Sequence, residues 1–405
     1  MIGLALRNLF RHRKRTTIAL ATISFGVIAL LLAGGFIDWI FWAMRESTIQ
    51  SRLGHIQVTR PDYFQAGSAD PFAFLLPEQL LQKVNLEAVP GVKVVSPRLS
   101  FTGLISHGDV TIGFLGEGVD PLKDADLSKY LTIVAGEKLD SAEPAGLVLG
   151  GGLARNLGVT VGDTVALLTT TASGGLNGVE GRVRGLFQSA SKEFDDATLR
   201  LPLNIARQLL RTSGAHSWVL LLDQTEHAGD VLQQLQVQYP EATSRLQFTP
   251  WYELAEYYQK TVKLFSRQMD AVRLIIALII ILSISNIQIM SFLERTGEIG
   301  TLMAIGLKRR KILQLFVNEG LMLGIIGGLF GVVIGTVLAI VISAVGIPMP
   351  PPPGMDIGYT SEILLTWPLV MGALLLAVLT TLLGSVYPAW KASSMKIVDA
   401  LRHNR

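Results

Sequence analysis

Residues 294–335 read ERTGEIGTLMAIGLKRRKILQLFVNEGLMLGIIGGLFGVVIG, and this stretch decides the fold. It starts with a charged turn and continues with a short segment whose apolar residues follow helical spacing. A basic cluster at 308–311 comes next, and the stretch ends in an apolar run threaded with glycines. Basic residues between two apolar runs are typical of a cytoplasmic connection between membrane helices. We therefore predict that 294–311 joins two such helices on the cytoplasmic side.

Composition indicates a membrane protein. Hydrophobic residues make up 49% of the 405 positions, and the mean hydropathy is positive at +0.43. The apolar residues concentrate in blocks that are long enough to cross a hydrocarbon core of about 30 Å as helices. We predict four transmembrane helices, at 16–44, 269–293, 312–345 and 363–387. The first block is too long for the apolar region of a signal peptide, so a retained helix is expected.

Lysine and arginine residues predict the orientation. They are concentrated in 1–15, 294–311 and 388–405, and the loop 346–362 contains none. Because cytoplasmic segments carry the excess of basic residues, both termini and the joint are expected in the cytoplasm. The long segment 45–268 and the loop 346–362 would then lie on the other face of an inner membrane, in the periplasm.

Segment 45–268 alternates strand and helix patterns and predicts one large α+β domain, inserted between the first and second membrane helices, or two subdomains of it. No proline or glycine separates Trp251 from Leu293, so one helix of about 60 Å is expected there. A break near Asp270 is the alternative. IPMPPPPG at 347–354 cannot be helical and should be extended, and Pro388 is expected to end the fourth helix.

Catalytic and nucleotide-binding patterns are missing from the sequence. The dipeptide Gly-Lys, which a P-loop needs, does not occur, and neither does H-E-x-x-H or G-x-S-x-G. The glycines 150–152 do not complete G-x-G-x-x-G because position 155 is arginine, so a strand-to-helix turn is expected. Without cysteine there is no disulfide or thiolate ligand. We expect no catalytic residue, no metal site and no directly bound cofactor, and the net charge of +3 is too small to indicate nucleic acid.

Six glycines of the predicted third helix form two series with a spacing of four. The series are Gly320, Gly324 and Gly328, and Gly327, Gly331 and Gly335. Such seams on a membrane helix let another helix approach closely. The partner helix belongs either to the same chain or to a second subunit, and the sequence leaves both interpretations open.

Five polar residues lie inside the predicted spans, where they are candidates for a transport pathway. They are Asp38, Asn286, Gln288, Asn318 and Glu319. A carboxylate in hydrocarbon is costly and can mark a pathway. However, no row of ionisable groups crosses the bilayer, which disfavours an ion-coupled carrier. For Glu319, pairing with the basic cluster at 308–311 or with interfacial water is expected.

The joint carries the specific signal. Ile299, Leu302, Met303 and Ile305 follow helical spacing before Gly306, and they predict a short helix with one apolar face at the membrane surface. One interpretation is a simple interfacial helix. The other is a docking element for a partner protein.

The stretch 294–335 resembles the signature of the FtsX-like/MacB permease family of ABC transporters. The shared features are a Glu-Arg start, Glu-Ile-Gly, Ala-x-Gly, a basic group, a glutamate and a glycine-rich helix. RNLFRHRKRTTIALATISFGV at 7–27 and YPAWKASSMKIVDALR at 387–402 resemble the family's first-span entry and closing motif. GEGVDP, GEKL and GLVLGGGLARNLGVTVGDTVAL resemble its extracytoplasmic core domain.

This resemblance implies a non-catalytic permease subunit that works with a separate P-loop ABC ATPase, which would bind ATP and Mg. Two ATPases would act on two permeases, in a homodimer or a heterodimer. The coupling helix that docks on the ATPase would lie within 294–306. Its expected contact residues are Glu294, Arg295, Gly297, Glu298, Ile299, Leu302, Met303, Ala304, Ile305 and Gly306.

The resemblance further implies mechanical work on the far side of the membrane. Because the sequence contains no P-loop, it points to a stand-alone permease of the lipoprotein-releasing (LolC/LolE-like) kind. The substrate would be a lipoprotein, a lipid or another amphipathic molecule, and the need for a periplasmic adaptor stays open. The alternative is a mechanotransmitting protein that signals to, or activates, a periplasmic partner.

Overall fold

The computed structural model describes residues 11, 13–67, 69–139, 146–189, 191–241, 245–350 and 358–395. Parts of the predicted basic termini (Arg7, Lys396, Arg402 and Arg405) and 351–354 of the predicted extended loop lie outside these residues. The chain forms two compact units, whose boundaries fall after Trp42, Lys260, Met349 and Tyr359. We call the first unit the helix bundle and the second, formed mainly by 43–260, the inserted domain.

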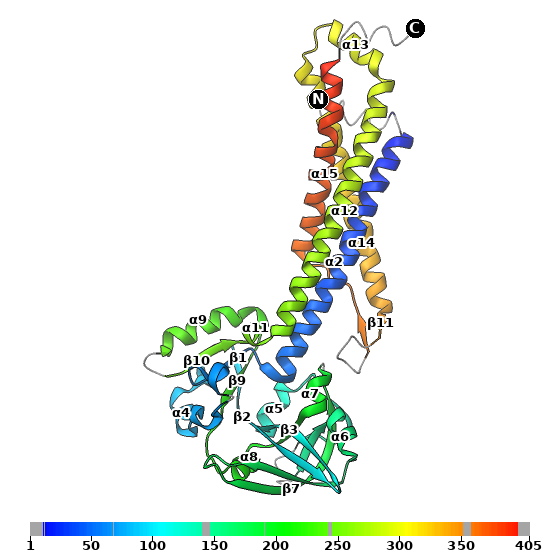
Figure 1. Ribbon diagram of the computed structural model, residues 1–405. Coiled ribbons are helices and arrows are strands. Elements are labelled where there is room, and N and C mark those ends of the chain that lie inside the picture. The colour runs from blue at the N-terminus through cyan, green and yellow to red at the C-terminus, as the bar shows by residue number, and fades with distance from the viewer. Residues whose placement is uncertain are drawn as a thin grey trace. The chain divides into compact units, whose positions relative to one another are not determined.

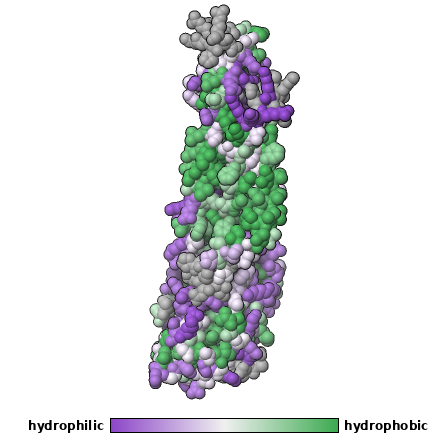
Figure 2. Space-filling view, turned by 90° about the vertical axis from the view of Figure 1, so that its right-hand side faces the viewer, coloured by the Kyte–Doolittle hydropathy of each residue, from purple (hydrophilic) through white to green (hydrophobic). Residues whose placement is uncertain are grey.

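In the described part of the chain, four helices are long and apolar enough to cross a membrane (Figure 1). They are α2 (Arg13–Thr48), α12 (Glu256–Glu294), α14 (Arg309–Val345) and α15 (Trp367–Ser394). A helix satisfies its own backbone hydrogen bonds, as hydrocarbon requires. Figure 2 shows hydrophobic side chains covering the middle of the bundle. The predicted four-helix membrane fold is confirmed.

Aromatic side chains mark the two membrane surfaces on α15. Trp367, in its first turn, is 79% exposed, and Trp390, near its end, is 60% exposed. Their separation of 23 residues corresponds to about 35 Å along a helix. Tryptophan is enriched at the membrane–water interfaces, which lie about this far apart.

The long helix expected from Trp251 to Leu293 starts later, at Glu256. Trp251–Leu254 forms a separate short helix, α11, and Ala255 interrupts the helix with φ −90° and ψ 62° before α12 begins. Trp251 and Ala255 are both buried in one apolar cluster of the inserted domain. This packing interrupts the helix although the sequence contains no proline or glycine there. The alternative break near Asp270 does not occur, and the 39 residues of α12 form a helix about 58 Å long.

The prediction that Pro388 ends the fourth helix is wrong, because α15 continues to Ser394. Proline has no N–H group and therefore frees the carbonyl four residues earlier. That carbonyl belongs to Gly384, and the Ser285 hydroxyl of α12 donates a hydrogen bond to it at 2.7 Å. A neighbouring helix thus supplies the donor that proline removes, and the helix persists.

Both glycine series of α14 pack against helices of the same chain, and all six glycines are buried. The series containing Gly324 faces α15, where an added Cβ would lie 2.2 Å from the Thr381 hydroxyl. The series containing Gly331 faces α2, where an added Cβ would lie 2.7 Å from Val27 Cβ and 2.9 Å from the Ser24 carbonyl. These contacts favour the intrachain interpretation and leave no glycine of the seams exposed for a second subunit.

The inserted domain contains a mixed ten-stranded sheet with the order β10-β1-β9-β2-β3-β8-β5-β7-β4, and β6 pairs with β2 and β7. Neighbouring strands are antiparallel except for the pairs β3–β8 and β5–β7. The strands are β1 (Ile56–Thr59), β2 (Val92–His107), β3 (Val110–Val119), β4 (Thr132–Gly136), β5 (Gly146–Gly150), β6 (Thr164–Thr170), β7 (Leu176–Gln188), β8 (Thr198–Pro202), β9 (Ser217–Leu222) and β10 (Gln247–Pro250).

Short helices connect these strands. They are α3 (Tyr63–Ala66), α4 (Glu78–Val84), α5 (Pro121–Leu127), α6 (Gly151–Leu157), α7 (Lys192–Ala197), α8 (Leu203–Leu210) and α9 (Ala228–Gln238), and a π-helical turn at Ile49–Leu53 follows α2. Two further strands, β11 (Ile347–Met349) and β12 (Tyr359–Ser361), form a separate two-stranded sheet.

Two large apolar clusters form most of the core of the inserted domain, and two smaller ones lie beside them. One large cluster gathers residues of β5, β6, β8, α6 and α8, and the other gathers residues of β1, β9, β10, α4 and α9. The glycines at 150–152 form the predicted strand-to-helix turn, where a Cβ on Gly150 would lie 2.1 Å from the Asp195 carbonyl. The predicted α+β domain is confirmed, with two large apolar clusters packed on one sheet.

Two histidines are buried in this domain. His216 Nδ1 accepts a hydrogen bond from the Ser100 N–H at 3.2 Å, and His55 Nδ1 accepts one from the Leu222 N–H at 3.0 Å. Burial lowers the pKa of each imidazole from 6.5 to about 4, because the charged ring would lose its hydration. Both rings are therefore neutral at pH 7.

The glycine seam generates a matched pair of substitutions. Gly331→Ala should destabilise the bundle by about 1–3 kcal/mol, because the methyl group meets Val27 and the Ser24 backbone. Gly372→Ala on α15, where no atom lies within 4 Å of the added Cβ, should instead stabilise by about 0.5–1 kcal/mol. Thermal unfolding in detergent measures both. Equal shifts for the two variants would contradict the packing described here.

The buried histidines predict a pH dependence of unfolding. Their folded-state pKa of about 4 lies below the unfolded value of 6.5, so the unfolded state binds more protons between these values. Stability should therefore be complete above about pH 6.5 and fall toward pH 4 by about 1.4 kcal/mol per pH unit for each histidine. Thermal unfolding between pH 7.5 and 5 tests this. His216→Gln should reduce the slope by about half, whereas the exposed control His227→Gln should leave it unchanged.

Candidate functional site: the cytoplasmic joint

The joint between α12 and α14 contains a short helix, α13 (Thr296–Ala304), as predicted. Gly306 ends it with a φ of 102°, a left-handed conformation that favours glycine. The Gly306 N–H donates to the Met303 carbonyl at 3.1 Å, and the Leu307 N–H donates to the Leu302 carbonyl at 3.0 Å. These bonds satisfy the last carbonyls of the helix and turn the chain toward α14.

The apolar residues of α13 do not form the predicted single face. Ile299 and Met303 are buried with Phe292 and Phe316 of the neighbouring helices. Leu302 and Ile305 point elsewhere and are 43% and 80% exposed. Residues four apart share one side of a helix, and the pair 302 and 305 lies on another side. One apolar pair thus anchors α13 in the bundle, and the other pair remains open.

A buried ion pair fixes the start of α13. Arg295 Nη1 lies 3.1 Å from Glu319 Oε1, and the two side chains are only 11% and 7% exposed. The expectation that Glu319 pairs with the basic cluster at 308–311 is therefore wrong, because its ion pair is with Arg295. Glu319 lies on the buried side of α14 between Phe316 and Gly320, whereas the cluster is exposed at the beginning of that helix.

Two further ion pairs connect the joint to the beginning of the first membrane helix. The Arg15 guanidinium contacts the Glu294 carboxylate, and Arg11 Nη1 lies 3.2 Å from Glu298 Oε1. The second pair is well exposed, so its free-energy contribution is small. Both pairs orient the joint toward α2. The opposite charges of RHRKR and ERTGE carry this signal in the sequence, but their spacing of about 280 residues hides it.

Two of the polar residues in the spans are hydrogen-bonded to neighbouring helices or their ends. Gln288 Nε2 donates to the Ser385 hydroxyl at 2.8 Å, and the Thr366 hydroxyl donates to Asp38 Oδ2 at 3.2 Å. Asn286 is exposed on α12, and Asn318 is half-buried on α14. Among the described residues, no hydrogen bond links Asp38, Gln288 and Glu319 to one another.

The structure separates the residues predicted for the ATPase contact into two groups. The exposed residues are Glu294, Glu298, Leu302, Ala304, Ile305 and Gly306. Arg295, Ile299 and Met303 are buried and hold the helix, and Gly297 is half-buried. Only the exposed group is free to contact a partner.

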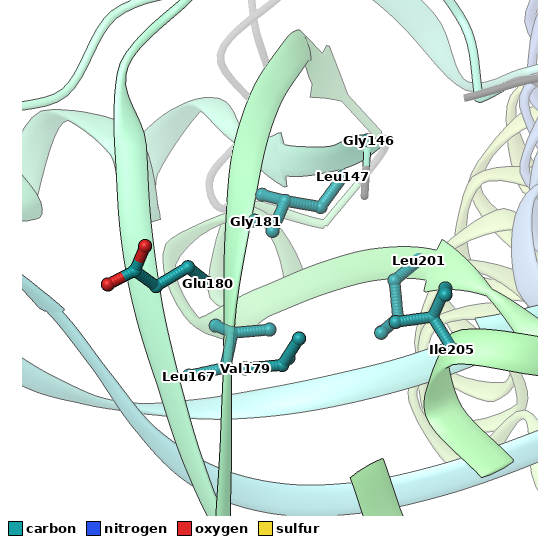
Figure 3. Close-up of a pocket in the computed structure, with 8 residues that line it drawn as sticks. All are labelled: Gly146, Leu147, Leu167, Val179, Glu180, Gly181, Leu201 and Ile205. Atoms are coloured by element: carbon teal, nitrogen blue, oxygen red, sulfur yellow. The ribbon is translucent and has the colours of Figure 1, made fainter. Parts of the chain in front are cut away.

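The inserted domain contains a pocket that is the alternative candidate site (Figure 3). Leu147, Leu167, Val179 and Leu201 contribute apolar side chains to it, and the Glu180 carboxylate points away from it. No group of three or more metal-ligating side chains occurs in the described part of the chain. A binding or catalytic pocket needs converging polar groups, which this one lacks. The joint therefore remains the candidate site.

The buried ion pair predicts a large difference between two neighbouring glutamates. Glu319→Gln should destabilise the joint by about 3 kcal/mol, because Arg295 would lose its buried carboxylate partner and keep only the longer contact, 3.6 Å, with the half-exposed Glu298. Glu298→Gln removes the exposed pair with Arg11 and the longer contact with Arg295, and it should cost less than about 1 kcal/mol because Arg295 keeps Glu319. Protease cleavage at the joint and thermal unfolding measure the difference. A milder effect at position 319 than at 298 would rule out the anchoring role.

Comparison with known proteins identifies two families whose models match this chain. The MacB-like periplasmic core domain family matches residues 16–238, more than half of the chain, and the FtsX-like permease C-terminal family matches residues 271–397. An uncharacterized ABC transporter permease of Methanocaldococcus jannaschii is 24% identical over 99% of this chain and 97% of its own length. The lipoprotein-releasing system transmembrane protein LolC of Xylella fastidiosa is 25% identical over 71% of this chain and 72% of its own length.

Among solved structures, the periplasmic region of MacB from Actinobacillus actinomycetemcomitans matches with a TM-score of 0.38 and 12% identity, over 54% of this chain and 95% of that chain. The joint and its glycine-rich helix lie within the match to the FtsX-like permease family, and most of the inserted domain lies within the match to the MacB-like core. The chain therefore belongs to the FtsX-like permease family of ABC transporters, with a MacB-like periplasmic core domain between its first and second membrane helices.

Proposed function

We propose that this permease is driven by a separate ABC ATPase that docks on the exposed side of α13, and that it moves its periplasmic domain to extract or shift a lipoprotein, a lipid or another amphipathic substrate. Two permease copies and two ATPase copies would form the working transporter in the inner membrane. ATP and Mg would bind to the ATPase only.

The observation that carries this proposal is that some apolar residues at α13 are buried in the bundle while others are exposed. Ile299 and Met303 fix the helix to the bundle, while Ile305 remains 80% exposed beside the basic residues 308–311. An isolated apolar residue in a charged surrounding is suited to fill a pocket of a partner, as the anchor residues of protein interfaces do. Arg295 and Glu319 hold the helix rigid, which lowers the entropy cost of docking.

The substrate class is supported by the relatives rather than by a pocket. LolC of Xylella fastidiosa, whose name specifies lipoprotein release, aligns with most of this chain. Release of a lipid-anchored molecule needs force on the outer side of the membrane, which a large domain attached to membrane helices can supply. A signalling role of the same machine would need the same docking of the ATPase but would release no lipid-anchored substrate.

The absence of cysteine from the chain allows a direct test of docking. Ile305→Cys and Leu302→Cys should each cross-link to a cysteine in the groove of the purified ABC ATPase, and Ile305→Asp should weaken binding about 30-fold or more, since an interface anchor contributes about 2 kcal/mol. Val345→Asp is the matched control, because Val345 is 82% exposed at the other end of α14.

The two interpretations of α13 predict different results. A simple interfacial helix would place both cysteines in lipid, protect them from water-soluble maleimides and leave ATPase binding unaffected by Ile305→Asp. Docking on the ATPase predicts labelling in the free permease and protection in the complex. ATP-dependent release of a radiolabelled lipoprotein from vesicles by the complex then separates transport from signalling.

A further inference from the structure

Four charged side chains are buried together in the inserted domain, far along the sequence from the joint. They are Arg98 of β2, Glu117 of β3, Asp124 of α5 and Arg200 of β8, and each is 2–6% exposed. Buried charges are costly unless they are paired and hydrogen-bonded. We call this group the charge cluster, and the contacts it makes outside itself indicate its role.

The charge cluster is balanced internally. Arg200 Nε donates to Glu117 Oε2 at 2.9 Å, and Arg200 Nη1 donates to Asp124 Oδ2 at 3.1 Å. Arg98 Nη2 donates to Asp124 Oδ1 at 2.8 Å. Burial raises the pKa of both carboxyls, but the guanidinium groups of Arg200 and Arg98 outweigh it and lower the pKa of each below its ordinary value. Both carboxyls are therefore ionised beside the two arginines.

Each arginine also donates to a backbone carbonyl, and both of these carbonyls belong to the same segment. Arg200 Nη2 donates to the Ser51 carbonyl at 3.0 Å, and Arg98 Nη1 donates to the Arg52 carbonyl. These carbonyls belong to the π-helical turn Ile49–Leu53, which continues α2 directly. The last carbonyls of a helix lack intrahelical partners and carry partial negative charge, so cations are favourable there.

The side chains of the turn add contacts of a different kind. Ile49 is fully buried against Leu127, Val219 and Trp251. The Arg52 guanidinium lies over the Phe194 ring at 5.1 Å from its centroid. Apolar contacts resist removal of the turn, but they permit rotation and sliding. Charge-assisted bonds to two successive carbonyls fix the axial position and the rotation as well.

We propose that Arg98 and Arg200 are positioning residues that hold the end of the first membrane helix in the periplasmic domain, so that a displacement of this helix enters the sheet at β2, β3 and β8. Glu117 and Asp124 orient the two guanidinium groups. This inference rests on the function proposed above and adds the residues through which movement reaches the domain.

Lysine substitutions test the contacts without removing the charges. Lysine at position 98 or 200 keeps a cation beside the carboxylates, but its single ammonium group cannot reproduce the fork that also reaches the helix end. Arg98→Lys/Arg200→Lys should therefore loosen the turn while the domain stays folded. Arg200→Lys alone provides a milder variant. The matched control is Arg207→Lys, because Arg207 pairs with Glu78 at 3.1 Å in the same domain.

The measurement uses the assembled transporter with spin labels at Leu176→Cys in the domain and Trp367→Cys on α15, which are 74% and 79% exposed. The distance between them is compared with and without a non-hydrolysable ATP analogue. The double lysine variant should lose the nucleotide-dependent change in distance, while Arg207→Lys retains it. Resistance to protease verifies that each domain is folded. A fluorophore at Gln50→Cys should report greater exposure of the turn even without the ATPase.

The outcomes separate this inference from the proposed function. A folded double variant with the full nucleotide-dependent change, or with an unaltered fluorophore at Gln50→Cys, would overturn the role of the arginines while leaving docking intact. If Ile305→Cys fails to cross-link to the ATPase and the unsubstituted chain shows no change in distance, the proposed function fails as well.

Discussion

Helix association in this bundle depends on the buried glycines of α14, which have no side chains and let the neighbouring helices approach closely. Lipid tails are as apolar as leucine, so burial of apolar surface contributes little free energy to the association of membrane helices. Close packing and hydrogen bonds between helices provide the driving force instead. Glycine provides both, because it brings backbones together and exposes their carbonyls. The Ser24 hydroxyl of α2 donates to the Gly327 carbonyl at 2.8 Å, at the start of one seam. The contacts of α14 with α2 and α15 place its first turns, and with them the joint, at a defined position.

Buried ion pairs appear where orientation matters in both units. Arg295 and Glu319 set the start of α13, and Arg98 and Arg200 with their carboxylates hold the end of the first helix. Apolar side chains of similar volume can stabilise a protein as well as buried charges do. Charged pairs, however, accept only one geometry. A protein that transmits movement benefits from elements that cannot rotate in place, and these two sites have that property.

Much of the architecture follows from local sequence. Length and hydropathy predict the four membrane helices, basic residues predict the joint, and alternation of apolar and polar residues predicts the strands around β6 and β7. The differences arise where distant residues decide. Ala255 interrupts a helix because its cluster packs there, and Pro388 stays within a helix because Ser285 is nearby. Periodicity groups Leu302 with Met303, yet only the position of the neighbouring helices determines which of them is buried.

The candidate site was predictable to the same degree. Its location and its apolar residues follow from the stretch 294–306, but the partner of Glu319 does not, since five basic residues lie within reach along the sequence and the helix geometry selects Arg295. The charge cluster of the inserted domain was not recognisable, because its members come from three strands and one helix separated by up to 102 residues, the interval from Arg98 to Arg200.

Because Pro388 leaves the Gly384 carbonyl without its helical donor, the hydrogen bond from Ser285 ties α12 and α15 together. If α12 slid along α15, the Gly384 carbonyl would lose its donor in hydrocarbon, where no water can replace it. The Ser285 hydroxyl would lose its acceptor at the same time. The two helices are therefore expected to shift as one body, and any elastic deformation during a working cycle must be sought in other parts of the bundle.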